Sequence, residues 1–176
     1  MSAQINELVA LAQGGSAEAF GELYELYYKE MYRYACCITG SEDLAQDAIS
    51  DAVLSAFRQI KSLKNPEVFK GWLFKILCAS CKRQYTENRH KTSLVYIDDG
   101  DTDFADPAGF DGIEISVDLK KAIAQLSKEE QEIVLLSVVS NYKSHEISEI
   151  LGITASTVRS KLNRALKKLR KTLENT

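Results

Sequence analysis

The sequence predicts an all-α protein made of two small helical domains joined by an acidic flexible linker. Apolar residues recur every three or four positions over most of the 176-residue chain, which is the period of a helix that buries one face. No segment keeps the strict alternation of a strand for long, and the two prolines, Pro66 and Pro107, lie at expected boundaries. Charge also divides the chain, because an acidic stretch separates a near-neutral part from a basic one.

Three helices are expected in the N-terminal part. The first is capped by Ser16 and ends at Gly40, and the second begins at Ser41 with two acids in its first turn, where the helix dipole favours them. Asn65 and Pro66 suit the N-cap and first position of a third helix. The apolar stripe of this third helix comprises Phe69, Trp72, Leu73, Ile76 and Leu77.

The net charge of -3 hides an uneven distribution of charge along the chain, and this distribution indicates the domains. Residues 1–89 hold ten bases and eleven acids, whereas residues 90–118 hold eight acids and one base. Residues 119–176 hold eleven bases and six acids. A basic module therefore follows an acidic connector whose composition is typical of a mobile segment.

The basic module contains the pattern of a helix-turn-helix. A short helix is expected over Ser144 to Leu151, Gly152 permits a sharp turn, and Thr154 can cap the next helix. That helix, TASTVRSKLNRALKKLRKTL, carries seven Lys or Arg and no acid. In a helix-turn-helix the second helix lies in the major groove of DNA.

The two faces of this basic helix differ in chemistry. At about 100° per residue, one face is apolar and suited to a core; its residues are Val158, Leu162, Ala165, Leu166 and Leu169. The other face offers hydroxyl, amide and basic groups that suit phosphates and base edges. The candidate DNA-binding residues are Ser156, Thr157, Arg159, Ser160, Asn163, Arg164 and Lys167.

No catalytic chemistry is predicted. The sequence has no zinc-protease motif, no Gly-rich phosphate loop and no defined nucleophile set, so neither an enzyme, a cofactor, a metal site nor a small-molecule substrate is expected. Cys36, Cys37, Cys78 and Cys81 are interpreted as buried free thiols, with a thiol or zinc sensor as a remote alternative. The N-terminus lacks the pattern of a secretory signal, which favours a cytoplasmic location.

Two longer segments resemble a bacterial sigma factor of the extracytoplasmic-function group. EDLAQDAISDAVLSAFRQI followed by FKGWLFKILCASCKRQ is similar to the family's region 2, and LKKAIAQLSKEEQEIVLLSVVSNYKSHEISEILGITASTVRSKLNRALKKLR is similar to its region 4. The expected domains are region 2 over 1–92, the linker over 93–115, and region 4 over 116–176.

The resemblance implies a transcription initiation factor that binds core RNA polymerase and promoter DNA. Region 2 would dock on the polymerase and bind the single-stranded −10 element, and region 4 would read the duplex −35 element. An anti-sigma factor, in many cases membrane-anchored, would hold the protein inactive. The implied polymerase-binding residues are Asp43, Gln46, Asp47 and Asp51, and those for the −10 region are Lys70, Trp72, Lys75, Lys82, Arg83 and Arg89.

The sequence departs from the family at two positions of the −10 segment. The family usually has Asn seven residues after the Trp and Asp eleven after it, where this chain has Ala79 and Arg83. The sequence therefore leaves the −10 specificity open. A dimeric helix-turn-helix repressor or activator is the alternative function, and it would need a dimer interface and palindromic half-sites.

Overall fold

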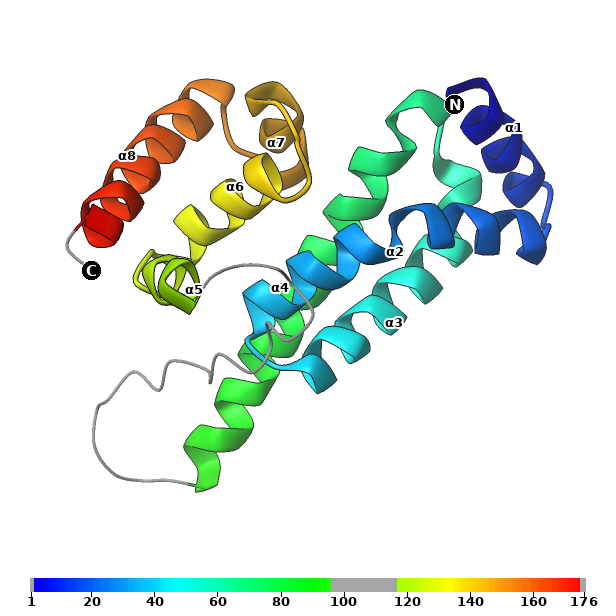
Figure 1. Ribbon diagram of the computed structural model, residues 1–176. Helices are drawn as coiled ribbons and strands as arrows, with labels where there is room; N and C mark the ends of the chain where they lie inside the picture. The colour runs from blue at the N-terminus through cyan, green and yellow to red at the C-terminus, as the bar shows by residue number, and fades with distance from the viewer. Residues whose placement is uncertain (1, 96–116, 175–176) are drawn as a thin grey trace.

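The computed structural model describes residues 2–95 and 117–174, and in these ranges every regular element is a helix. Helices α1–α4 form one bundle and α5–α8 form a second, smaller one (Figure 1). The predicted all-α fold is confirmed. The predicted linker, 93–115, lies outside the described residues apart from its first three positions.

The N-terminal bundle begins with a helix that the sequence pattern did not predict. In this helix, α1 (Ser2–Gln13), Val9 and Ala12 are buried. The Gln13 side chain donates to the carbonyls of Ile60 and Leu63 at 3.0 and 2.7 Å, which ties α1 to the distant α3–α4 connection. The remaining elements are α2 (Ala17–Thr39), α3 (Glu42–Gln59), short 3-10 turns at Ile60–Ser62 and Pro66–Val68, and α4 (Phe69–Val95).

The predicted boundaries of α2 and α3 are confirmed by their caps. The Ser16 hydroxyl accepts a hydrogen bond from the backbone N–H of Ala19 at 3.1 Å. Gly40 ends α2 with a φ of 70°, a left-handed conformation that costs glycine little. The Ser41 hydroxyl accepts from the backbone N–H of Leu44 at 3.4 Å. Short local signals therefore set this helix–turn–helix connection.

The third predicted helix begins differently from expectation. Asn65 accepts a hydrogen bond from the backbone N–H of Glu67 at 3.0 Å, and Pro66 occupies the first helical position. The first turn, however, is a 3-10 turn, and the α-helix proper starts at Phe69. The proline lacks an N–H and fixes its own φ, so it suits such a tight first turn.

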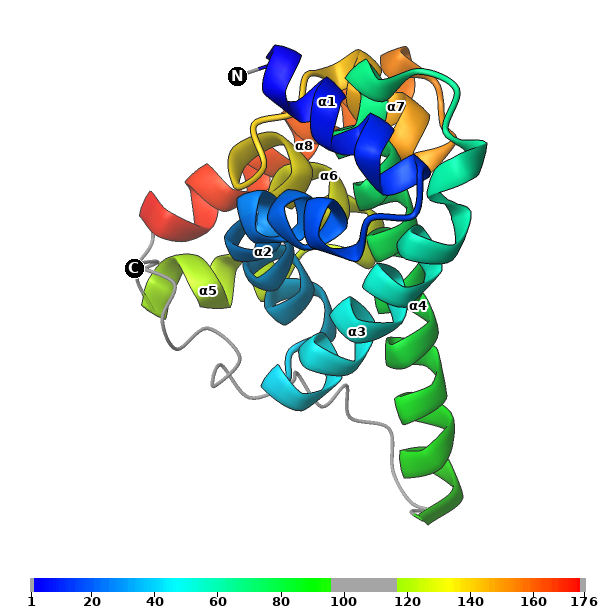
Figure 2. The same cartoon turned by 90° about the vertical axis from the view of Figure 1, so that its right-hand side faces the viewer.

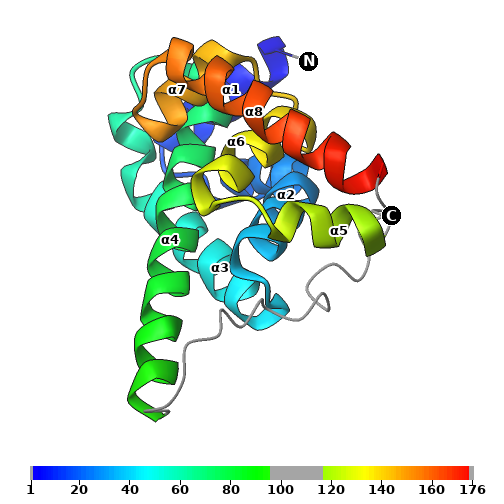
Figure 3. The same cartoon turned by 90° about the vertical axis from the view of Figure 1, so that its left-hand side faces the viewer.

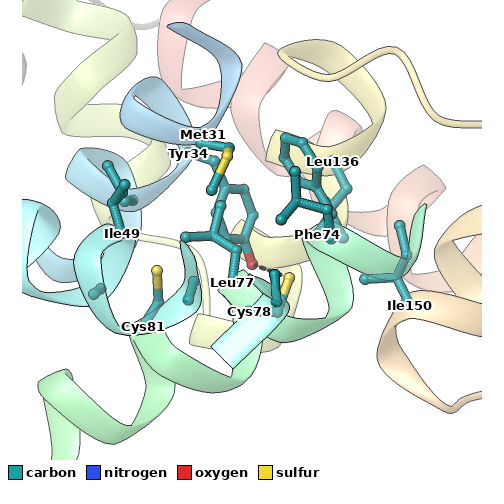
Figure 4. Close-up of a cluster of buried hydrophobic side chains, with 14 of the residues drawn as sticks. Met31, Tyr34, Ile49, Phe74, Leu77, Cys78, Cys81, Leu136 and Ile150 are labelled. Atoms are coloured by element: carbon teal, nitrogen blue, oxygen red, sulfur yellow. Dashed lines mark hydrogen bonds between the residues drawn. The ribbon is translucent and has the colours of Figure 1, made fainter. Parts of the chain in front are cut away.

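The core of the N-terminal bundle lies between α2, α3 and α4 (Figure 4). Tyr34 and Phe74 are fully buried, with ring centroids 6.1 Å apart in an edge-to-face arrangement. The thiol of Cys78 donates to the Tyr34 hydroxyl at 3.1 Å, so the phenol has a partner inside the core. Met31, Ile49 and other apolar side chains surround this pair.

The C-terminal bundle is held together by a buried amide. Gln131 is 5% exposed, and its Nε2 donates to the carbonyls of Ile123 and Leu126 at 3.1 Å each. Ile123 lies in the last turn of α5, where its carbonyl also accepts from the backbone N–H of Leu126 at 3.0 Å, and Leu126 follows the helix. The Gln131 amide thus supplies a further donor to the carbonyls at the end of α5. The elements of this bundle are α5 (Val117–Ala124), α6 (Lys128–Val138), α7 (Ser144–Leu151) and α8 (Ala155–Glu174).

A capping box fixes the start of α6 and connects it to α8. The Ser127 hydroxyl accepts from the backbone N–H of Glu130, and the Glu130 carboxylate accepts from the backbone N–H of Ser127. The ammonium group of Lys168 on α8 reaches the same carboxylate at 2.7 Å. One acid therefore caps a helix and pairs with a cation across the bundle. The hydrogen bond from Lys168 and those from Ser127 lower the pKa of Glu130.

Replacing Glu130 with alanine is expected to lower the free energy of unfolding by about 1 kcal/mol, since it removes half of a capping box. Chemical denaturation at neutral pH would measure the loss. Because the pKa of Glu130 is lowered in the fold, its contribution is present above the ordinary pKa of a glutamate and disappears as the pH falls through the lowered value. The difference between wild type and Glu130→Ala should therefore shrink in acid.

Glu129→Ala is the control for this prediction. Glu129 lies one residue earlier in α6 and pairs with Lys161, but its side chain is 47% exposed and it takes no part in the capping box. Exposed ion pairs contribute little. Equal losses for the two variants would contradict the capping role of Glu130.

The two bundles pack against each other; Figure 2 views the pair with the N-terminal bundle in front, and Figure 3 with the C-terminal bundle in front. Helix α6 contacts α2, and α7 contacts α4. Buried residues of both bundles, including Leu77 from one and Leu136 and Ile150 from the other, belong to a single apolar cluster. The sequence predicted two domains on a linker and gave no sign of this contact.

Candidate nucleic-acid interface

The helix-turn-helix predicted at the C-terminal end is present in the fold. Gly152 ends α7 with a φ of 70°, and Thr154 accepts a hydrogen bond from the backbone N–H of Thr157 at 3.2 Å, as a cap of α8. Ile147 and Val158 are fully buried where the two helices meet. This packing fixes the angle at which α8 is presented.

The polar face of α8 is open to solvent. Of the candidate DNA-binding residues only Thr157 is half-buried; Ser156, Arg159, Ser160, Asn163, Arg164 and Lys167 are exposed. Arg164 donates through Nε to the carbonyl of Ser160 at 3.4 Å, and Ser160 donates to the carbonyl of Thr157 at 3.1 Å. Leu166, which the periodicity assigned to the apolar face, is 42% exposed, so that face is narrower than predicted.

The candidate polymerase-binding residues share one helix, α3, but not one environment. Asp43, Gln46 and Asp47 are exposed. Asp51 is half-buried and accepts hydrogen bonds from Arg83 at 2.6 Å and from Gln84 at 2.9 Å. The hydrogen bond from Gln84 and the cationic Arg83 lower the pKa of Asp51. Asp51 thus lies between the two candidate surfaces and orients Arg83.

The candidate −10 residues on α4 differ in accessibility. Lys75 is exposed, while Trp72 is half-buried and packs against the core with its ring centroid 5.9 Å from that of Phe69. Lys70 and Lys82 both have partners in the C-terminal bundle. The side chain of Arg89 lies outside the described residues. The five described side chains of this set therefore do not form one open surface.

The sequence-based interpretation missed the residues that bring the bundles together. Glu132 pairs with Lys82 at 3.2 Å although its own side chain is only 6% exposed. Tyr142 is buried against Phe74, with ring centroids 5.4 Å apart. Glu132 is one of three acidic residues in the first turns of α6, and no local pattern distinguishes it from an acid that faces solvent.

All four cysteines are buried, and none of them forms a disulfide. Burial raises the pKa of Cys78 to about 12 and also raises that of Cys81. Thiols with raised pKa values react slowly, because the thiolate is the nucleophile. Within residues 2–95 and 117–174, no three His, Cys, Asp or Glu side chains are placed to hold a metal ion, and no helix is long and apolar enough to cross a membrane.

Comparison with known families matches both halves of the chain. Residues 23–91 match the family described as Sigma-70 region 2, and residues 116–169 match the family described as Sigma-70, region 4. The first match runs from within α2 to near the end of α4, and the second runs from the start of α5 to within α8.

Curated relatives that match most of the chain are sigma factors. "RNA polymerase sigma factor SigV" of Bacillus subtilis is 28% identical over 142 residues, which cover 81% of this chain and 83% of the relative. "ECF RNA polymerase sigma factor SigM" of Mycobacterium tuberculosis is 26% identical over 168 residues, covering 95% and 83%. The solved structure of the sigma factor RpoE with the anti-sigma factor NepR from Bartonella quintana has the same fold. Its TM-score is 0.69 at 23% identity, and the alignment covers 90% of this chain and 98% of that chain.

The fold and its surfaces define a two-domain helical protein with a DNA-binding helix-turn-helix at its C-terminal end. The two family matches together account for most of the chain. The chain belongs to the sigma-70 family of RNA polymerase sigma factors, in the extracytoplasmic-function group.

Proposed function

We propose that this sigma factor recruits core RNA polymerase to promoters, with region 2 on the polymerase and the −10 strand and region 4 on the −35 duplex. The exposed polar face of α8 carries this proposal, because it projects from a helix-turn-helix whose apolar side is committed to the core. Proteins of this family are initiation factors, and the polymerase performs the chemistry. Transcription in vitro with core polymerase on genomic DNA fragments, followed by mapping of the start sites, tests it. Start sites that do not depend on the added protein would refute the proposal.

The residues proposed for each contact are those whose chemistry fits the partner. The seven polar residues of α8 are assigned to the −35 duplex, and Asp43, Gln46 and Asp47 to the polymerase. Lys75, Lys70, Lys82 and Arg83 are assigned to the −10 strand, since basic groups follow a single-stranded backbone. The proposed domains remain region 2 over 1–92 and region 4 over 116–176.

An anti-sigma factor is the proposed regulator. The solved relative from Bartonella quintana was crystallised with such a factor, and its fold matches 90% of the present chain. Co-purification of this protein with a partner that blocks its transcription in vitro would support the proposal.

Changing Gln46 and Asp47 together to alanine is expected to weaken binding to core polymerase about tenfold or more. Both side chains are exposed in the second turn of α3, and a loss of more than about 1 kcal/mol is expected when the main contact residues of an interface are truncated. Titration of labelled protein with core polymerase measures the affinity, and circular dichroism checks the helix content.

The double variant Gln4→Ala, Glu7→Ala is a matched control. It removes one amide and one carboxylate from exposed positions of a different helix, α1. If the α3 variant binds polymerase as tightly as this control, the docking surface lies elsewhere.

A further inference from the structure

The sequence left the −10 specificity open at Ala79 and Arg83, and the structure shows how these two positions are arranged on α4. Together with Lys75 they are spaced four residues apart, so the three residues follow one face of the helix. All three are exposed. Side chains four residues apart are neighbours on a helix, and Ala79 presents only a methyl group there. A flat ligand can therefore approach Arg83 over this turn of α4.

Arg83 is held in place by the neighbouring helix α3. Its Nη2 donates to the Oδ2 atom of Asp51 at 2.6 Å. The same oxygen accepts from Nε2 of Gln84 at 2.9 Å, so the carboxylate is itself fixed between α3 and α4. The hydrogen bond from Gln84, and then that from Arg83, lower the pKa of Asp51, which is therefore charged at neutral pH. A guanidinium group fixed in this way loses little further freedom when it binds a ligand.

The surroundings of Arg83 disfavour a phosphate. Besides Asp51, the carboxylate of Glu87 lies 3.9 Å from the Nε of Arg83. One cation thus lies between two carboxylates, and the three groups together are negatively charged. A phosphate that approached Arg83 would be repelled by both acids. Arg83 therefore suits an uncharged acceptor better than the backbone of a strand.

The guanidinium group of Arg83 matches the edge of a guanine. It has five N–H donors in a planar fork, and the hydrogen bond to Asp51 uses one of them. The side chain is 52% exposed, so the part of the fork that faces away from α3 is open to solvent. Guanine presents two adjacent acceptors, N7 and O6, whereas adenine and cytosine present an amino group that donates. The fork therefore favours guanine over both.

We propose that Arg83, held by Asp51, selects a guanine of the −10 strand by donating to N7 and O6 of the base. Asp51 is a positioning residue, because it acts through Arg83 and does not touch the base. The proposal rests on the proposed function, since it takes this face of α4 as the surface that binds the −10 strand. It gives Arg83 a role different from that of Lys75, which is expected to contact phosphates.

The test is the affinity of the full chain, bound to core polymerase, for labelled single strands that carry the −10 sequence found from mapped start sites. Each position holds in turn guanine, adenine, or 7-deazaguanine, which lacks the N7 acceptor. At one position guanine should bind about tenfold more tightly than adenine, and 7-deazaguanine should lose part of this advantage. An element in which no position prefers guanine would overturn the proposal.

Variants at Arg83 identify the residue that reads this position. Arg83→Ala should abolish the preference for guanine and leave the preferences at other positions unchanged. Arg83→Lys should abolish most of it as well, because an ammonium group keeps the charge but lacks the planar fork. Lys75→Ala, on the same face, should instead weaken all strands alike and reduce the salt dependence. If Arg83→Lys keeps the preference, or Arg83→Ala weakens all strands alike, Arg83 binds the backbone and the proposal is wrong.

Asp51→Ala tests the positioning role. The ratio of affinities for the guanine and adenine strands should fall severalfold, because the freed guanidinium must be ordered on binding. Asp51→Asn should keep most of the ratio, since its amide oxygen can still accept from Arg83. Both strands are compared on the same complex, so a change in affinity for polymerase or in stability cancels. An unchanged ratio in Asp51→Ala would overturn the role of Asp51.

Failure of this proposal can be distinguished from failure of the proposed function. Start sites that depend on the protein but show no preference for guanine overturn the proposal alone. If the wild type directs no start sites, the proposed function fails. The free full chain is then titrated with a thymidine strand of about 12 nucleotides that carries one central guanine, adenine or 7-deazaguanine. Equal affinities for the three strands would overturn the role of Arg83.

Discussion

Replacing Phe74 with alanine is expected to lower the free energy of unfolding by about 3–5 kcal/mol, the usual cost of removing a large aromatic side chain from a core. Phe74 is completely buried on α4. Its ring centroid lies 6.1 Å from that of Tyr34 on α2 and 5.4 Å from that of Tyr142 in the α6–α7 turn. The substitution therefore leaves a cavity at the point where the two domains share their core. Urea denaturation followed by circular dichroism measures the loss.

Phe57→Ala is the matched control for this cavity. Phe57 lies on α3, is 39% exposed and contacts one aromatic ring, Phe20, at 5.1 Å. Its truncation removes the same atoms but leaves a site that solvent can fill, so a clearly smaller loss is expected. Equal losses at the two positions would show that Phe74 is not a central element of the core.

Arg159→Ala is expected to weaken binding to the −35 duplex by about 1–3 kcal/mol and to relax sequence preference. Arg159 is exposed near the N-terminus of α8, and in a helix-turn-helix this end of the second helix contacts the base edges. Lys167 lies two turns farther along, where phosphate contacts are expected. Lys167→Ala should weaken all duplexes alike and reduce the salt dependence by about one charge.

The measurement is the affinity of the full chain for two duplexes over a series of salt concentrations. One duplex carries the −35 sequence found from mapped start sites, and the other carries substitutions within it. If Arg159→Ala loses the same affinity on both duplexes, Arg159 contacts the backbone. The assignment of the reading residues would then be wrong.

Local signals predicted the helices well, because caps depend on a few adjacent residues. Ser16, Gly40, Gly152 and Thr154 each make the backbone contacts that their types favour, and the structure confirms them. The start of α4 was less predictable, since Pro66 is compatible with both a 3-10 and an α-helical first turn. The helix α1 has a short apolar pattern and is fixed by contacts of Gln13 with residues almost fifty positions away.

The residue types of the candidate surfaces could be predicted from the sequence, but the exposure of each side chain could not. The exposed polar residues of α8 could be predicted because the period of an amphipathic helix separates them from the core. It could not show that Asp51 binds Arg83, or that Glu132 lies against Lys82, since these pairs join residues 32 and 50 positions apart. Their partners are chosen by the packing of whole helices, which no motif encodes.

The four buried thiols can report on openings of the core, because they react with an added reagent only when they become accessible. Cys36 and Cys81 have no exposed surface, and Cys78 lies beside Tyr34 under the helices that region 4 covers. An alkylating reagent can reach these sulfurs only during openings of the core, so the rate of labelling counts how often such openings occur. Mass spectrometry could follow each cysteine separately, without an added dye. The cysteines for which a redox role was considered can thus be used to measure how often the core opens.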